Sequence, residues 1–122
     1  MTQYTTLTLL PSTVYGTPSG NYNGSNTTFI GNVVPAANYY AGQGVVQTLT
    51  YTTNGFVGVI TIQATLNDNN PQAAWFDIDS YGNATVPTTG THANSVMGNF
   101  SYLRAAVTDF TAGNITVVTA SY

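Results

Sequence analysis

The sequence carries very little charge. Its 122 residues include no lysine and no glutamate, one arginine and four aspartates, so that only 4% are charged and the net charge is −3. An average domain has about 25% charged residues. A chain with a single fixed positive charge cannot neutralise a row of phosphates or an anionic lipid surface. This composition predicts a protein that binds neither nucleic acid nor a membrane.

Cysteine and long apolar runs are also missing. The absence of cysteine excludes disulfides, thiol chemistry and cysteine-ligated zinc. No run approaches the roughly 20 apolar residues that a spanning helix needs. The opening MTQYTTLTLL lacks the basic and apolar regions of a signal peptide, so none is expected. With 43% hydrophobic residues, the chain is expected to fold as one domain over residues 1–122.

The strong helix formers are sparse, whereas Thr, Val, Ile, Tyr and Phe dominate, which favours strands. Turn-rich stretches at 11–26, 35–44, 67–72 and 81–95 separate the apolar segments. Several short strands with such punctuation predict an all-β fold, an antiparallel β-sandwich with jelly-roll-like character. The expected strands are Tyr4–Leu10, Thr27–Val34, Val45–Thr53, Phe56–Leu66, Ala74–Asp79, Phe100–Thr108 and Asn114–Ser121.

The sharpest local signal is Asn54-Gly55 between two β-rich runs. Asn-Gly is the preferred centre of a two-residue hairpin turn, because both positions need a positive φ. A hairpin here predicts one hydroxyl-rich face and one nearly apolar face. Gln47 is the misfit on the apolar face, and its amide is expected to pair with the backbone. The predicted inward residues are Val45, Leu49, Tyr51, Ile60, Ile62 and Ala64; the predicted outward residues are Thr48, Thr50, Thr52, Val59, Thr61 and Gln63.

The C-terminal segment follows the same alternation. Two strands are expected across a turn at residues 111–114. The predicted inward residues are Leu103, Ala105 and Val107, with Tyr102 and Arg104 on the opposite face.

The stretch AAWFDIDS (73–80) holds the only tryptophan and two of the four aspartates, Asp77 and Asp79. As one strand, it would place Phe76 and Ile78 inward and Trp75, Asp77 and Asp79 on the other face. Two carboxylates on one face of one strand cannot flank a glycosidic bond, which argues against hydrolysis. We therefore interpret both aspartates as polar residues at a strand edge.

Metal binding is the rival interpretation for the neighbouring turn. Asn67, Asp68, Asn69 and Asn70 offer oxygen ligands of the kind that calcium prefers. Their spacing matches no calcium loop, and NDNNP is typical of a tight turn. The sequence therefore predicts a turn and no metal or other cofactor.

The remaining ionisable residues also favour structural roles. His92 lies in the segment GTHANS without a nucleophile motif and is expected to be an exposed loop histidine. Arg104 is expected to form a structural ion pair with Asp77, Asp79 or Asp109. The sequence predicts that the protein is not an enzyme.

Aromatic residues allow a different function. Tyr22, Tyr39, Tyr40 and Tyr81 fall in predicted loops, where they could contact a glycan or a protein partner. Tyrosine also fills sheets and interfaces by preference, so core packing is the competing interpretation.

Three phrases carry a resemblance to a known family. They are VQTLTYTTNGFVGVITIQATL, AAWFDI and GNFSYLRAAVTDFTAGNITVVTASY, which together lie within Val45 to Tyr122. They resemble a small virion-protein module of tailed phages, especially marine and cyanobacterial ones. The first 44 residues match less well and are expected to be the segment specific to this protein's docking.

The resemblance implies a non-enzymatic β-sandwich built into the virion. The function expected from it is capsid decoration or cementing, through binding to the major capsid protein and to further copies of this chain in a homotrimer or another symmetric oligomer. The alternative is a carbohydrate-binding module of a tail, fibre or head appendage. The family has no catalytic residues to carry over.

Overall fold

The computed structural model describes residues 6–20, 22–35, 45–65, 75–98 and 100–121. All strands pair in one antiparallel sheet with the order β1-β7-β5-β6, and three short strands also pair with β7. The antiparallel all-β prediction is confirmed, whereas the jelly-roll connectivity stays a prediction. The strands are β1 (Thr6–Leu10), β2 (Thr13–Val14), β3 (Phe29–Ile30), β4 (Val34–Pro35), β5 (Val45–Thr65), β6 (Phe76–Gly98) and β7 (Tyr102–Ser121).

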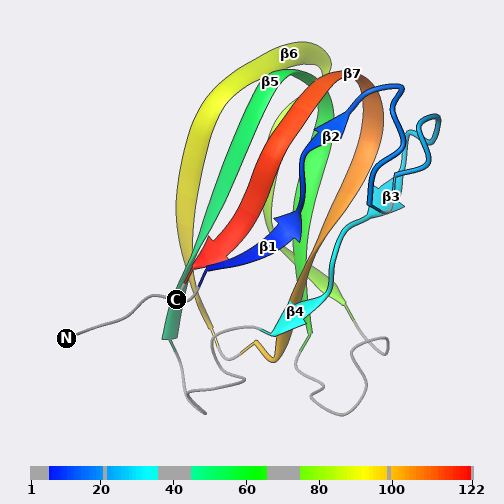
Figure 1. Cartoon of the computed structure of the whole chain (residues 1–122). Helices are drawn as coiled ribbons and strands as arrows, with labels where there is room; N and C mark the ends of the chain where they lie inside the picture. Colours follow the sequence, from blue (N-terminus) through cyan, green and yellow to red (C-terminus); the bar gives the residue numbers. More distant parts are fainter. Residues whose placement is uncertain (1–5, 21, 36–44, 66–74, 99, 122) are drawn as a thin grey trace.

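The three long strands bend near their middles, so that the sheet folds over on itself (Figure 1). The first layer contains β1, the first half of β5 and the last halves of β6 and β7, paired through residues 45–53, 90–98 and 115–121. The second layer contains the other halves, paired through 58–64, 76–83 and 103–108, with β3 and β4 beside β7. The two layers enclose the core.

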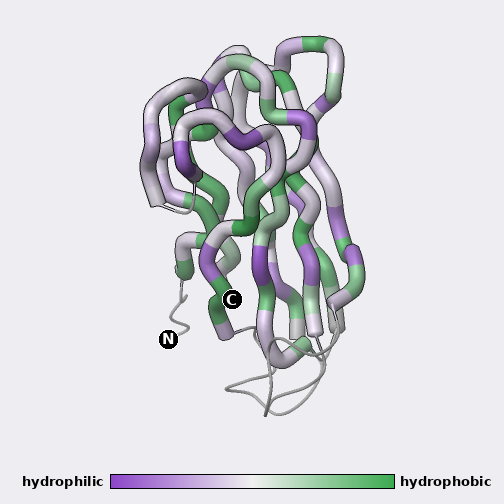
Figure 2. The backbone as a smooth tube through the Cα atoms, turned by 90° about the vertical axis from the view of Figure 1, so that its right-hand side faces the viewer, coloured by the Kyte–Doolittle hydropathy of each residue, from purple (hydrophilic) through white to green (hydrophobic). Residues whose placement is uncertain are grey.

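The core is built from the alternating residues of both layers. Along the long strands, hydrophobic and hydrophilic residues follow one another closely (Figure 2). Alternate side chains of a strand point to opposite faces, so one apolar set lines the inside of each layer. The buried hydrophobic residues from β5 and β7 are Leu49, Tyr51, Phe56, Ile60, Ile62, Ala64, Leu103, Ala105, Val107, Phe110, Ile115, Val118 and Ala120. The predicted inward sets are confirmed, except for Val45, whose side chain lies outside the described residues.

Gln47 is fully buried among these apolar residues. Its Nε2 donates to the backbone oxygen of Val96 at 2.8 Å. The prediction that this amide pairs with backbone is confirmed, and the hydrogen bond removes the cost of burying an unpaired polar group.

The predicted hairpin at Asn54-Gly55 is wrong. β5 continues through these residues, and Asn54 pairs with Asn114 of β7. Gly55 has the predicted positive φ, +64°, but this conformation produces a bulge in a central strand that has β6 on one side and β7 on the other. The strand therefore bends at Gly55, and the chain does not reverse its direction there.

The turn predicted at 111–114 is also a bend within one strand. β7 runs from Tyr102 to Ser121, and it contains positive φ values at Asp109 (+56°) and Gly113 (+84°). On both sides of their bends, β5 and β7 bury alternate side chains. The predicted inward residues are therefore correct, although the predicted turns do not exist.

The segment 81–95, predicted as a loop, belongs to β6. Its turn-forming residues include Gly82, Pro87 and Gly90. β6 pairs only with β5 in the described sheet, and an edge strand tolerates proline and glycine better than a central one. Pairing with β5 therefore outweighs the turn propensity of these residues.

The prediction of one strand at Thr27–Val34 is partly wrong. The segment forms two short strands, β3 and β4, because the backbone at Asn32 leaves β7 and turns to β1. The amide of Gly31 donates to Ala105 O at 2.7 Å, and the amide of Asn32 donates to Leu9 O at 2.8 Å. A Cβ at Gly31 would lie 2.4 Å from that Leu9 oxygen, so glycine allows β1 to approach.

Candidate functional site at the β6 edge

A β-bulge in β6 separates the two aspartates of AAWFDIDS. Ile62 lies opposite Asp79 and Gln63 lies opposite Asp77, which leaves Ile78 as the extra residue. Asp79 therefore turns to the inner side beside buried Ile62, and Asp77 turns outward with Gln63. The prediction that Asp77 and Asp79 share a face is wrong, because strict alternation fails at a bulge. Ile78 packs on the core as predicted.

Phe76, the other residue predicted inward, lies opposite buried Ala64. It is nevertheless 40% exposed. Its ring contacts Phe100 with 5.9 Å between the centroids. The predicted inward side is correct, but an edge strand leaves the ring only partly covered.

Asp79 connects the two layers at this edge. The Tyr51 hydroxyl, from the first layer, donates to Asp79 Oδ2. Asn94 Nδ2, also from the first layer, donates to Asp79 Oδ1 at 2.8 Å. Both carboxylate oxygens thus accept hydrogen bonds from the opposing layer. We call this arrangement a polar clasp, because it joins the two layers at the β6 edge.

Aromatic rings complete the edge. The ring of Tyr81 stacks on Tyr51 with 4.9 Å between the centroids and 7° between the planes. His92 lies 5.6 Å from Tyr81 and 6.2 Å from Tyr51. His92 is exposed as predicted, but it lies on β6 and not in a loop, opposite Tyr51. Its ring is therefore held against the two tyrosines.

The hydroxyl of Tyr81 is also bonded. It lies 3.1 Å from Thr53 Oγ1, and Thr53 Oγ1 donates its proton to the carbonyl of Thr88 at 3.0 Å. Tyr81 must therefore be the donor to Thr53. The hydroxyls of Tyr51 and Tyr81 and the carboxylate of Asp79 are thus used in contacts within the protein.

The environment of Tyr51 changes its acidity. Burial raises the pKa of the Tyr51 hydroxyl well above its usual range, and the hydrogen bond and charge of Asp79 raise it further. Deprotonation would place a second negative charge beside a carboxylate in a buried position.

We expect a pH-dependent stability from this tyrosine. Above pH ~10 the unfolded chain releases the Tyr51 proton, whereas the folded chain keeps it because its folded pKa is raised, so the free energy of unfolding falls as pH rises. The slope for one such group is about 1.4 kcal/mol per pH unit. Urea unfolding of Tyr51→Phe between pH ~9 and ~11.5 should show a shallower decline by about that amount.

The matched control for this measurement is Tyr15→Phe. Tyr15 is 46% exposed, and we expect this variant to keep the wild-type slope. Equal slopes for Tyr51→Phe and the wild type would contradict the assignment.

Arg104 lies in a second polar group on the outer side of the second layer. Its Nε donates to Gln63 Oε1 at 2.8 Å, and Gln63 Nε2 donates to Asp77 Oδ1 at 3.0 Å. The guanidinium carbon lies 4.3 Å from the centroid of the Trp75 ring, a cation–π contact. Arg104 and Asp77, which we predicted as an ion pair, are thus connected through the amide of Gln63.

The other two predicted partners of Arg104 lie elsewhere. Asp79 belongs to the clasp described above, and Asp109 is exposed at the bend of β7. The structure does not bring the three aspartates together around the arginine.

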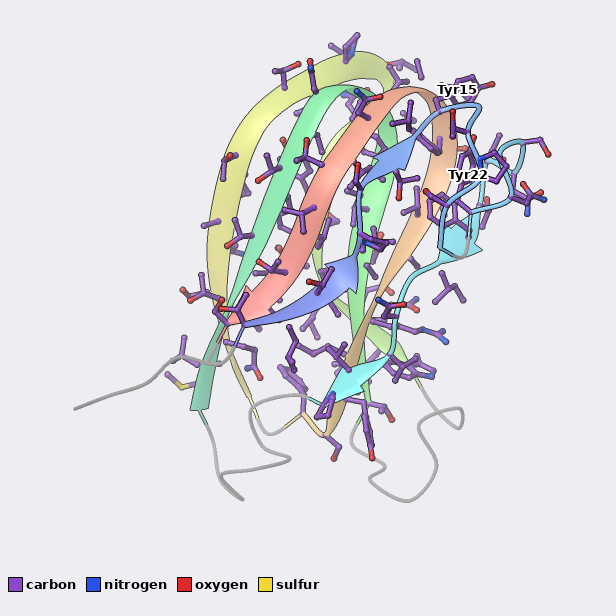
Figure 3. The ribbon with its side chains drawn as sticks, viewed as in Figure 1. Tyr15 and Tyr22 are labelled. Atoms are coloured by element: carbon purple, nitrogen blue, oxygen red, sulfur yellow. The ribbon has the colours of Figure 1, made fainter. Side chains whose placement is uncertain are left out.

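The four tyrosines considered as a contact surface are not equivalent. Tyr22, labelled in Figure 3, is buried, with 1% of its surface exposed. Its ring packs on Phe29 and Phe110, with centroid distances of 5.0 and 5.2 Å. Its oxygen accepts the amide hydrogen of Gly16 at 2.9 Å. Tyr22 is therefore a core residue and cannot stack on a ligand. Tyr39 and Tyr40 lie outside the described residues.

Known proteins do not identify the chain. No family model, curated protein or solved structure matches it. Within the described residues, no group of three or more histidine and acidic side chains could hold a metal ion, and no helix could span a membrane. Asn67 to Asn70, weighed above as calcium ligands, lie outside the described residues.

The outer side of the first layer carries a set of hydroxyl groups. On the outside of the first layer, hydroxyl side chains from four strands lie side by side, and we call this set the hydroxyl face. Oxygen–oxygen distances are 3.0 Å for Thr6–Ser121, 3.0 Å for Thr48–Ser95 and 3.3 Å for Thr52–Thr91. Its members are Thr6, Thr8, Thr48, Thr50, Thr52, Thr91, Ser95, Thr119 and Ser121.

The β5 part of this face follows the predicted alternation. The β6 part was missed because the segment GTHANS was interpreted as a loop. Its signal was the alternation of Thr91, Ala93 and Ser95 with His92 and Asn94.

Proposed function

We propose that the chain is a non-enzymatic structural protein of a phage virion, a decoration or cement protein that binds the major capsid protein and stabilises the head. The observation that carries the proposal is the hydroxyl face, which spans four strands and contains no charged residue. The resemblance in strand pattern to phage virion modules is the reason for placing the protein in a virion. The comparisons add no relative to this support.

The chemistry of the hydroxyl face suits permanent assembly. Threonine offers a methyl group and a hydroxyl that can both donate and accept, so a partner backbone or hydroxyl can dock without displacing a charge. Because no ion pairs are involved, salt does not screen such a contact. A protein that must stay attached to a particle in water of high ionic strength benefits from this property.

The polar groups of the described residues also favour a structural role over hydrolysis. Asp77 and Asp79 lie on opposite sides of the sheet, so they cannot act together on one bond as paired carboxylates do. Asp79 accepts two hydrogen bonds from the opposing layer, and Asp77 is held by Gln63. These contacts stabilise the fold.

The carbohydrate alternative receives less support. It needs exposed aromatic faces, and of the tyrosines considered for it, Tyr22 is buried and Tyr81 stacks on Tyr51. Tyr22 lies beside β7, whereas Tyr81 lies on β6 at the other end of the sheet order, so the two do not form one platform.

The test is to locate the protein on purified particles and to challenge its docking face. We expect it on the capsid shell, retained in ~1 M salt, and we expect particles without it to lose their genome at lower temperature. Thr50→Lys places a charge in the middle of the hydroxyl face and should abolish binding to capsids that lack the protein. Thr61→Lys, a matched change on the outer side of the second layer, should bind as the wild type does.

Two results would contradict the proposal. One is location on the tail or fibre; the other is equal capsid binding by Thr50→Lys and the wild type. Glycan-array binding by the purified protein would instead favour the carbohydrate function.

A further inference from the structure

The two ends of the sheet are different. At the β7 side, the edge is divided among short strands of two to five residues, β1 to β4. At the other end, β6 is 23 residues long and, in the described sheet, pairs with β5 alone. A long edge strand presents a row of unpaired backbone donors and acceptors, which is a template for pairing with another chain.

The first half of β6, residues 76–83, is protected against such pairing. It carries Asp77 and Asp79, and the bulge at Ile78 interrupts its regularity. Self-pairing of this half would bring carboxylates of two copies together, and like charges opposite one another are destabilising. Pro87 then interrupts the row of donors at the bend.

The last half of β6, residues 90–98, has none of these features. Residues 90–98 pair with β5 in nine consecutive positions without a register shift. The segment, GTHANSVMG, contains no aspartate, lysine, arginine or proline. Met97 is 74% exposed, more than any other large hydrophobic side chain of the described residues. This segment is regular and uncharged, and no other described strand pairs with its outer edge.

We propose that this edge binds a second copy of the chain, with residues 90–96 of the two copies pairing antiparallel about a two-fold axis at Ala93. The occupant follows from self-complementarity. Residues that lie opposite each other in an antiparallel pair point to the same face of the sheet. The two-fold axis must therefore pass through a residue, because an axis between two residues would set outward side chains opposite inward ones. Ala93 puts the smallest side chain of the segment, apart from its glycines, where a residue meets its own copy.

The register about Ala93 extends contacts that the sheet already makes. It sets Thr91 opposite Ser95 of the second copy, twice, and these hydroxyls continue the Thr52–Thr91 and Thr48–Ser95 pairs at 3.3 and 3.0 Å. On the inner side it sets His92 opposite Asn94. It also sets Met97 opposite Thr89, which covers part of the exposed thioether side chain.

The pairing joins the hydroxyl faces of two copies into one continuous surface. It stands on the geometry of β6 and does not require a virion. If the proposed function also holds, the unit that docks on a capsid is this two-fold pair.

The first test is a charge at the axis. Ala93→Lys places two lysine side chains directly opposite each other in the pair, with their Cβ atoms about 5 Å apart, and the repulsion of like charges should weaken association at least about tenfold in sedimentation equilibrium. Thr50→Lys is the matched control, because Thr50 lies opposite Ala93 on the adjacent strand and on the same face, one strand from the edge. It should keep the wild-type association, although we expect it to lose capsid binding.

The second test does not depend on how the lysine variant folds. The chain has no cysteine, so Ala93→Cys introduces a single thiol that meets its own copy across the axis. Oxidation at low protein concentration should give a disulfide-linked dimer whose β-sheet circular dichroism is unchanged, and Thr50→Cys should stay monomeric under the same conditions.

A wild-type protein that is monomeric at ~100 µM overturns the inference. So does association that Thr50→Lys abolishes and Ala93→Lys leaves intact, since that result would place the contact on the sheet face. Capsid binding by a monomeric protein would overturn the edge pairing and leave the proposed function standing.

Discussion

Gly113→Ala is expected to lower the free energy of unfolding by about 3 kcal/mol or more, a large share of the roughly 5–15 kcal/mol that stabilises a small domain. Gly113 has φ +84°, a conformation that costs an L-residue about 1–2 kcal/mol. A Cβ there would also lie 2.1 Å from the carbonyl oxygen of Gly55 and 2.6 Å from the amide nitrogen of Phe56. These are backbone atoms of the neighbouring strand at its own bend, so they cannot move aside without separating β5 from β7.

The control isolates the steric part of this effect. Gly16 has a similar φ of +88°, but a Cβ there meets no atom within 4 Å. Gly16→Ala should therefore cost only the conformational strain, about 1–2 kcal/mol. Urea unfolding followed by circular dichroism measures both variants, and equal losses for the two would show that the strands do not approach at this bend as described.

Phe110→Ala should cost about 3–5 kcal/mol, because it removes a large buried ring and leaves a cavity. Phe110 is fully buried where the N-terminal segment meets the bends of β5 and β7. Its ring centroid lies between 5.2 and 6.0 Å from those of Tyr15, Tyr22, Phe29 and Phe56. Four contact partners lose packing at once, and the segment that carries Tyr22 loses its main support.

Phe76→Ala is the matched control, since the same side chain is removed where it is 40% exposed and contacts one other ring. Its expected cost is about 1 kcal/mol. Thermal unfolding should separate the two variants by ~10 °C or more. Similar midpoints would mean that the aromatic cluster around Phe110 contributes little to stability.

The alternation of residue types could be interpreted correctly from the sequence. Leu49, Tyr51 and Ile60 on β5 and Leu103 on β7 point inward as predicted, and Gln47 pairs its amide with backbone. The reason is local: in a strand that is buried on one side, the two-residue period of the side chains is the same whichever strand lies next to it.

The bends could not be predicted in the same way. Gly55 has a positive φ, which a hairpin turn needs at two successive residues and which a bulge needs at one. The choice depends on whether β5 has partners on both sides over its full length, which it has. The bulge at Ile78 is a similar case, because it moved Asp79 from the outer side to the clasp with Tyr51.

A nearly uncharged, antiparallel all-β protein could be predicted from composition and alternation, together with the inward residues of its two main strands, because both signals act over a few neighbouring residues. The folding over of three long strands, the edge strand at 81–95 and the place of Tyr22 in the core became clear only from the folded chain. These outcomes rest on pairing between residues tens of positions apart. Such pairing outweighs local turn preferences, since a strand that satisfies its backbone groups along a neighbour gains more than a turn of four residues.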